Sequence, residues 1–497
     1  MQASEEIAQE TMKSEKNTEK ESPDSQTKST DSGKYDYDML VIGSGPAGER
    51  AALQAAKLGK RSAIVERHSV IGGVMIHTGT LPSKTLRETV LYIAGLRQRS
   101  IYGLHFELKN KLTIKELMYR KDNVIQKEME VITDQLSRNG VDVVTGYGIL
   151  TGPHRVLISS GSDTNRMITA EKIVISVGTH PYHPPGLDFD NKYVYDGETI
   201  LELDEIPRTM TIVGGGVIGC EYACIFAHIG VKVTLLDTRQ RLLGFIDDEI
   251  SDVLVYLMRK YRIKLILGDG AKDITVRDGK VITVTDSGRR IVSDRMLYSA
   301  GRSGNTENLG LEALNIETNK RGLVKVDEHF RTACDSVYAV GDVIGFPSLA
   351  SVSMDQGRIA SYHAFNDNGV KRNPVINELM PYGIYTIPEL SLVGETEESA
   401  REKGEEFEVG ISRFHELARG QIMNDQDGLL KLIFRREDKR LIGVHIIGER
   451  ASELIHIGQA VMSFGGTIDY FIESVFNYPT LSEAYKVAAL DGISRLG

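Results

Sequence analysis

Two stretches of the chain share one order of apolar and polar positions. Residues 37–66 read as an apolar run, a glycine-rich turn, an alanine-rich segment and a second apolar run, and residues 208–237 repeat that order. A continuous apolar run beside an apolar helix indicates a strand that is buried on both faces of a parallel sheet. The pattern therefore predicts two strand–turn–helix–strand units in an α/β protein.

The pattern changes near both ends of the chain. From about residue 375, short apolar strands such as 429–434 and 441–447 alternate with helices such as 453–462, which predicts an α+β region. Residues 1–34 consist mostly of Lys, Glu, Ser, Thr and Gln. Such a segment buries too little apolar surface to offset its ordering entropy, so we expect a disordered tail.

The glycines of the two units have the spacing of a dinucleotide-binding turn. Gly43 permits the tight turn, Gly45 lets the backbone approach a pyrophosphate, and Gly48 allows the helix to pack closely on the strand. Glu66 ends the second strand, where a carboxylate accepts hydrogen bonds from a ribose. One such fingerprint is weak evidence, but two in register are strong. The second set is Gly214, Gly216, Gly219 and Asp237.

Composition narrows the classes of function. The chain has 497 residues, which is too long for a single hydrophobic core, so we expect several domains. Its content of 41% hydrophobic and 26% charged residues is that of a globular protein. A net charge of −10 argues against a nucleic-acid partner. No apolar run is long enough for a membrane span, and no metal site is predicted. Three cysteines, an odd and sparse count, favour a reducing, cytoplasmic location.

The segment from Gly72 to Lys84 resembles the active-site helix of the flavin-dependent disulfide reductases. Members of that family carry a cysteine pair between the Gly72-Gly73 and Pro-Ser-Lys positions, where this chain has Met75 and Thr80. Neither side chain forms a thiolate, so neither can attack or rebuild a disulfide. The resemblance extends over residues 36–497.

The resemblance implies a fold with two Rossmann-like dinucleotide-binding domains, for FAD and for NAD(P), and an α+β C-terminal dimerisation domain. The expected parts are a disordered tail (1–34), an FAD-binding domain (35–185 and 305–374), an NAD(P)-binding domain (186–304) and an interface domain (375–497). It also implies a homodimer or higher homo-oligomer, with nicotinamide nucleotides as its small-molecule partners.

Site residues follow from the same resemblance. Lys84 is expected beside the reactive nitrogen of the flavin, with Glu221 as its ion-pair partner; both are the predicted catalytic residues. The FAD set is Gly43, Gly45, Gly48, Glu66, Arg67, Gly72, Gly73, Thr80, Lys84, Gly178, Gly341, Asp342 and Ala350. The NAD(P) set is Gly214, Gly216, Gly219, Glu221, Asp237, Arg239 and Gly301.

A second departure from the family concerns proton transfer. Disulfide reductases carry a His-Pro-Thr motif near the C-terminus, and this chain has Tyr478-Pro479-Thr480. A phenol with a pKa near 10 is a poor base at neutral pH. The thiols and their base are therefore missing together, which favours a different chemistry over simple loss of function.

Without a dithiol, the reduced flavin must pass its electrons directly to another acceptor. The leading candidate is a second nicotinamide, so we predict reversible hydride exchange between NADPH and NAD⁺ by a ping-pong scheme through FAD. The segment Asp237–Arg241 fits both substrates. Asp237 suits the 2′-hydroxyl of NAD(H), and Arg239 or Arg241 suits the 2′-phosphate of NADP(H).

Three alternatives stay open at this point. Arg239 and Arg241 could be merely solvated, which would leave an NAD-specific enzyme. The same scaffold could reduce a quinone or another acceptor with NAD(P)H. The chain could also be a flavin-bound scaffold subunit with little turnover, although an intact Lys84 and Glu221 argue against that reading.

Overall fold

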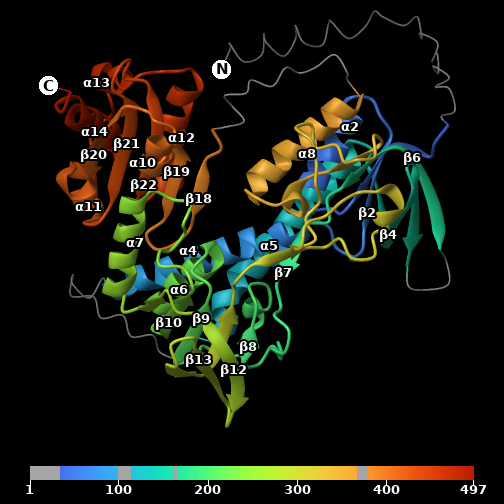
Figure 1. Ribbon diagram of the computed structural model, residues 1–497, viewed down its shortest axis with the longest axis horizontal. Helices are drawn as coiled ribbons and strands as arrows, with labels where there is room; N and C mark the ends of the chain where they lie inside the picture. The colour runs from blue at the N-terminus through green and yellow to red at the C-terminus, as the bar shows by residue number, and fades with distance from the viewer. Residues whose placement is uncertain (1–33, 99–112, 161–164, 366–378, 497) are drawn as a thin grey trace, which may run out of the picture. The chain divides into compact units, whose positions relative to one another are not determined.

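The computed structural model describes residues 34–98, 113–160, 165–365 and 379–496, and residues Tyr37–Gly497 form one compact unit (Figure 1). The tail predicted for residues 1–34 lies outside the described residues up to residue 33, as does the predicted boundary between residues 374 and 375. Both predictions therefore stay untested.

The first region is built on a mixed sheet in the order β3-β2-β1-β6-β5-β4, with β17 paired to β6. Strands β1, β2, β3, β6 and β17 are parallel, whereas β4 and β5 add an antiparallel edge. The central strand β1 is apolar on both faces because helices cover one face and the β4–β5 side covers the other. The strands are β1 (Tyr37–Ile42), β2 (Ser62–Glu66), β3 (Asp142–Thr145), β4 (Tyr147–Gly152), β5 (Arg155–Ser159), β6 (Arg166–Ile175) and β17 (Val337–Ala339).

Two helices of this region, α2 and α8, lie side by side although about 300 residues separate them in sequence (Figure 1). A Cβ placed on Gly357 of α8 would lie 2.0 Å from the carbonyl oxygen of Ala47 in α2, so glycine is required for this close approach. The helices are α2 (Pro46–Lys57), α3 (Gly73–His77), α4 (Thr80–Gln98), α5 (Ile114–Arg138) and α8 (Ala350–Phe365), with the 3-10 turns η3 (Glu312–Leu314) and η4 (Gly341–Ile344).

The second region contains a five-stranded sheet in the order β11-β10-β9-β15-β8, and every pairing is parallel. Its elements are β8 (Val194–Tyr195), η2 (Thr199–Glu202), β9 (Thr209–Val213), α6 (Val217–His228), β10 (Lys232–Asp237), α7 (Asp248–Lys260), β11 (Lys264–Leu267) and β15 (Arg295–Tyr298). An antiparallel sheet of β12 (Ala271–Arg277), β13 (Lys280–Thr285) and β14 (Arg290–Ser293) follows β11, and β7 (Thr179–Pro181) pairs with β16 (Arg302–Gly304) at the crossing between the regions.

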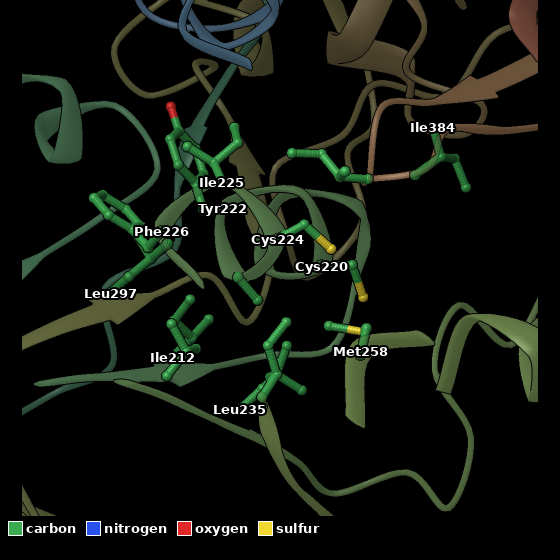
Figure 2. Packing of buried hydrophobic residues seen from close by; sticks show 14 of the residues in the cluster. Ile212, Cys220, Tyr222, Cys224, Ile225, Phe226, Leu235, Met258, Leu297 and Ile384 are labelled. Carbon is green, nitrogen blue, oxygen red and sulfur yellow. The ribbon is translucent and has the colours of Figure 1, made fainter. Parts of the chain in front are cut away.

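Helix α6 is buried on nearly all sides, as its sequence of mostly apolar residues predicts. Figure 2 shows Cys220 and Cys224 among the apolar side chains of this core, which include Met258 and Ile384. Burial raises the pKa of the Cys224 thiol to about 12 and that of Cys220 well above its usual value. These thiols are structural, since a thiolate is the reactive form.

The C-terminal region has an antiparallel sheet in the order β18-β19-β22-β21-β20, with helices packed on it. Its strands are β18 (Tyr382–Ile384), β19 (Leu390–Gly394), β20 (Phe407–Arg413), β21 (Leu429–Arg435) and β22 (Leu441–Ile447). Its helices are α10 (Glu397–Glu402), η5 (Phe414–Glu416), α11 (Ala418–Met423), α12 (Ala451–Ser463), α13 (Asp469–Glu473) and α14 (Glu483–Ile493).

Two Rossmann-like sheets followed by an α+β region confirm the fold class predicted from the sequence. Among the described residues, no helix is both long enough and apolar enough to cross a membrane.

Candidate functional site

A cavity of about 590 Å³ opens where the strands of the first sheet end. The turn after β1, the end of β2, helix α3, the β6–β7 connection, η4 and the start of α8 all contribute to its walls. The carboxyl ends of parallel strands are the usual place for a nucleotide in such a fold. The predicted FAD residues that line this cavity are Gly43, Gly45, Glu66, Arg67, Gly73, Thr80, Gly178, Gly341, Asp342 and Ala350.

The glycine turn after β1 forms a cradle for phosphate. Gly43 has a φ of 103°, and a Cβ on Gly48 would lie 2.0 Å from the carbonyl oxygen of Gly43. A Cβ on Gly45 would meet nothing within 4 Å, so that position faces open space at the N-terminus of α2. Backbone N–H groups and the helix dipole favour an anion there. The turn therefore fits the pyrophosphate of FAD.

Glu66 is buried and fixed by hydrogen bonds. Its Oε2 accepts from the N–H and the hydroxyl of Ser44, at 3.0 and 2.6 Å, and its Oε1 accepts from the N–H of His68 at 3.0 Å. The Ser44 hydroxyl also accepts from the N–H of Gly72 at 3.0 Å. Oε1 accepts only this one bond and has room for a further donor, so Glu66 fits a ribose hydroxyl.

Asp342, in η4, also lines the cavity. Burial raises its pKa above the usual value, and the nearby charge of Arg302 opposes that rise. Arg302 donates to the carbonyl oxygen of Thr179 at 2.8 Å and pairs with Glu198 at 2.7 Å. Glu198 and Thr179 both line the cavity, so Arg302 ties these two parts of the cavity wall together.

Lys84 and Glu221 form an ion pair between α4 and α6. The Lys84 Nζ lies 2.7 Å from Glu221 Oε2, and the Glu221 side chain is only 5% exposed. The second oxygen of Glu221 accepts from the N–H of Tyr385 at 2.9 Å, and the Lys84 Nζ lies 5.0 Å from the centre of the Tyr385 ring. Both carboxylate oxygens are therefore paired, and the burial of this charge is compensated.

None of the described residues that line the cavity is a cysteine. Met75 and Thr80 stand in its wall, and Tyr478 is 74% exposed in the C-terminal region. These three positions therefore provide neither the two thiols nor the histidine base that dithiol–disulfide exchange requires.

The second glycine turn has the same shape as the first. Gly214 has a φ of 107°, a Cβ on Gly219 would lie 1.8 Å from the carbonyl oxygen of Gly214, and a Cβ on Gly216 would meet nothing within 4 Å. Gly301 lies at the crossing after β15, where its carbonyl oxygen accepts from the N–H of Tyr182 at 3.0 Å. The turn at the N-terminus of α6 therefore also fits a pyrophosphate.

Asp237 is buried at the end of β10 and is held by Arg239. Its Oδ1 accepts from the Nε of Arg239 at 2.9 Å, and its Oδ2 accepts from an Nη of Arg239 at 2.7 Å. Burial would raise the pKa of Asp237, but these bonds and the one from the Gly215 N–H outweigh it and hold the pKa below its usual value. The Arg239 side chain is 51% exposed, so it can turn toward solvent.

The predicted residues do not all reach the cavity, and the prediction also missed residues. Gly48, Gly72 and Lys84 are not among the residues that line it; Gly48 serves helix packing, and the N–H of Gly72 donates to the hydroxyl of Ser44. Tyr385 was missed because it lies 164 residues from Glu221 in sequence and contacts it through the backbone. The position of Ser44 between two fingerprint glycines is a signal that could have found it.

Comparison with known families matches two regions of the chain. Residues 37–357 match the pyridine nucleotide-disulphide oxidoreductase family, and residues 380–489 match the dimerisation domain of that family. The chain is 46% identical over 462 residues to the soluble pyridine nucleotide transhydrogenase of Mycobacterium tuberculosis (strain ATCC 25177 / H37Ra), which covers 93% of this chain and 98% of the relative. It is 44% identical over 466 residues to the enzyme of the same name in Sodalis glossinidius, covering 93% and 99%.

Solved structures show the same likeness. LpdA from Mycobacterium tuberculosis has a TM-score of 0.84 at 26% identity, and covers 91% of this chain and 99% of its own. The HOCl-induced flavoprotein disulfide reductase RclA from Escherichia coli has a TM-score of 0.82 at 28% identity, with the same coverage.

Proposed function

The chain belongs to the pyridine nucleotide-disulphide oxidoreductase family, and on that premise we propose that it is an FAD-dependent soluble pyridine nucleotide transhydrogenase. It moves hydride reversibly between NADPH and NAD⁺. The observation that carries this function is that Met75 and Thr80 line the cavity, in a chain whose ion pair of Lys84 and Glu221 is complete.

FAD, when bound, supplies a group that both accepts and donates hydride. The Gly43–Gly48 turn would hold its pyrophosphate, and Glu66 would accept from its ribose. Asp342 also lines the cavity. These assignments rest on the fit of the turn and on the open space at Gly45.

Lys84 places one positive charge close to the reacting atoms, and Glu221 keeps that charge in position. A cation there stabilises negative charge that develops during hydride transfer. The reaction moves a hydride from one nicotinamide to another and needs no proton. For this reason a histidine at position 478 is unnecessary, and an exposed Tyr478 is compatible with turnover.

One nucleotide turn at Gly214–Gly219 serves both substrates in alternation, which gives a ping-pong scheme. Arg239 neutralises Asp237 when no nucleotide phosphate is present. With NADP(H), the exposed guanidinium can turn to the 2′-phosphate; with NAD(H), it stays on Asp237. The loop therefore discriminates little between the two nucleotides.

The match to a dimerisation domain indicates a homo-oligomer, and we propose a homodimer or a higher assembly of dimers. Large exposed apolar side chains in the C-terminal region, Phe464 at 92% and Val475 at 95%, are surfaces that such an interface would cover. We propose a cytoplasmic location because the three cysteines of the sequence are all unpaired.

The test uses purified, flavin-replete protein with NADPH and thio-NAD⁺, and follows the formation of thio-NADH. Steady turnover with parallel-line kinetics is the expected result. Reduction of a quinone without nucleotide exchange would replace the proposal with a quinone reductase. Inactivity with both acceptors would support a scaffold role instead.

A further inference from the structure

A buried cluster of charges joins the second region to the C-terminal sheet. The side chain of Lys431, in β21, is 1% exposed, and its Nζ lies 2.8 Å from Asp247 Oδ1, 2.5 Å from Glu397 Oε1 and 3.1 Å from Glu249 Oε2. His445 lies opposite Lys431 on the neighbouring strand β22, and burial lowers its pKa, which disfavours a positive charge on its ring. Lys431 is thus the cation that these carboxylates share.

Asp247 stands where the ribose loop ends. We use this name for residues 238–246, which connect Asp237 to the start of α7. The Asp247 side chain is fully buried and caps α7 by accepting from the N–H of Glu249 at 3.1 Å. Lys431 therefore holds the residue that fixes both the last position of the loop and the first turn of the helix.

Further contacts carry this anchor back toward the nucleotide. Arg241 pairs with Asp248, the first residue of α7, at 2.7 Å. The carbonyl oxygen of Leu242 accepts from the hydroxyl of Ser251 in α7 at 3.0 Å. At the other end of the loop, the carbonyl oxygen of Arg239 accepts from the N–H of Gly268 at 2.9 Å. The loop is held at both ends, and Lys431 governs the end at α7.

We propose that Lys431 is a positioning residue for the binding of the adenosine half of NAD(P)(H), acting through Asp247 on the ribose loop. The inference rests on the proposed function, because that function assigns the ribose to Asp237 and Arg239. Part of nucleotide recognition then depends on Lys431, a residue of β21 in the C-terminal sheet. Loss of the Lys431 contacts frees the end of the loop and weakens the binding of the adenosine half of the nucleotide. Hydride transfer near Lys84 and Glu221 is unchanged.

The experiment measures the binding of 2′,5′-ADP, which contains the adenosine half of NADP(H), to the flavin-replete enzyme by calorimetry. Lys431→Met removes the ammonium group and keeps an unbranched side chain. The matched control is Lys439→Met, in the same C-terminal region, whose Nζ pairs with Asp469 at 3.1 Å and is partly exposed. We expect Lys431→Met to raise the Kd about fivefold, or about 1 kcal/mol, and Lys439→Met to leave it unchanged.

Two kinetic readouts separate positioning from general damage. The KM of NADPH should rise in Lys431→Met by about the same factor as the Kd, with kcat within about twofold of the wild type. Reduced nicotinamide mononucleotide lacks the adenosine half, so its rate of flavin reduction should not change. An equal loss with this short donor would overturn the proposal, because it would mean that the variant damages the active site as a whole.

Lys431→Met removes one partner from a cluster of buried ion pairs, and the loss of such a partner is strongly destabilising, so a variant that keeps the fold is needed as well. Asp247→Asn is the second variant, since asparagine keeps the shape and still caps a helix. It should raise the Kd of 2′,5′-ADP in the same direction. An unchanged Kd in a folded Asp247→Asn enzyme would reject the positioning role. Failure of the wild type to form thio-NADH would reject the proposed function, and the binding result would still decide the role of Lys431.

Discussion

Glu66 and Asp237 occupy the same place in two copies of one structural unit, yet their partners differ. Glu66 accepts from the backbone and hydroxyl of Ser44 and from the backbone of His68, all within its own region. Asp237 accepts from one backbone N–H at the turn and from the side chain and N–H of Arg239.

The difference matches the two uses of the nucleotide. The contacts of Glu66 cannot move without unfolding the turn, and the cavity beside it is lined by ten of the residues predicted to bind FAD. Asp237, in contrast, takes two of its bonds from the half-exposed side chain of Arg239, which can rotate away while the bonds from the N–H groups of Gly215 and Arg239 stay in place. This contrast fits the proposal that one unit retains its nucleotide and the other exchanges it.

The largest effect is expected when the ion pair between Lys84 in α4 and Glu221 in α6 is broken. Lys84→Met should lower kcat for thio-NADH formation by about 10²–10³-fold, because it removes a preorganised charge beside the reacting atoms. Stopped-flow reduction of the flavin by NADPH measures this directly. The double variant with Glu221→Gln should lose less than the sum of the single losses. Additive losses would show that the two residues act independently.

The equivalent glycines offer a matched pair. Gly45 and Gly216 have negative φ values and open space around a Cβ, so alanine fits the backbone at both. Gly45→Ala should weaken FAD binding by about 1–3 kcal/mol and lower the flavin content of the purified protein. Gly216→Ala should keep its flavin and raise the KM of both nucleotides instead. If Gly216→Ala lost its flavin as readily, the assignment of the two turns would be wrong.

A smaller effect is expected at the ribose loop. Arg239→Ala should raise the KM of NADPH about tenfold and that of NADH about twofold, because a charge-assisted bond to the 2′-phosphate is lost only with NADPH. Steady-state kinetics with each nucleotide measures the ratio. Arg277→Ala is the control, since Arg277 is exposed at the end of β12 and is not among the residues predicted to bind the nucleotide. Equal increases for the two nucleotides would mean that Arg239 does not contact the phosphate.

The pH dependence of stability tests the pairing of Asp237 itself. The pKa of Asp237 is lowered in the folded protein, so its contribution to stability is complete above the unfolded value near 3.8 and is lost as pH falls through the folded value. The difference in free energy of unfolding between the wild type and Asp237→Asn should be constant from about pH 5 to 8 and shrink below about pH 4. Denaturant titrations at several pH values measure it, and a difference that shrinks near neutrality would contradict the pairing.

The smallest expected effect is that of thiol reagents. Burial raises the pKa values of Cys220 and Cys224, and both are fully buried in the core around α6. Native enzyme should keep its activity after treatment with iodoacetamide, and mass spectrometry should find these two residues unmodified until the protein is denatured. Loss of activity together with modification of Cys220 would show that a thiol takes part in turnover.

The two nucleotide units were predictable from the sequence because their signals are local. A strand, a glycine turn and a helix lie within 30 residues, and the fold class was confirmed. The partners of the site residues were not predictable, because they depend on contacts between distant segments. The backbone of Tyr385 reaches Glu221 from the C-terminal region, and Lys431 reaches Asp247 across 184 residues. Apolar periodicity carries no record of such polar pairs.

The hydrogen bond from the N–H of Tyr385 to Glu221 has a consequence for protein engineering. The two oxygens of this carboxylate accept from groups of two other segments, Lys84 and Tyr385, so residues 208–237 contain Glu221 but neither of the groups that hold it. A chimera that takes only this unit from a relative would import Glu221 and lose the matched neighbours that hold it. Swapping cofactor preference between such enzymes therefore calls for transplanting the segment around Tyr385 together with the ribose loop.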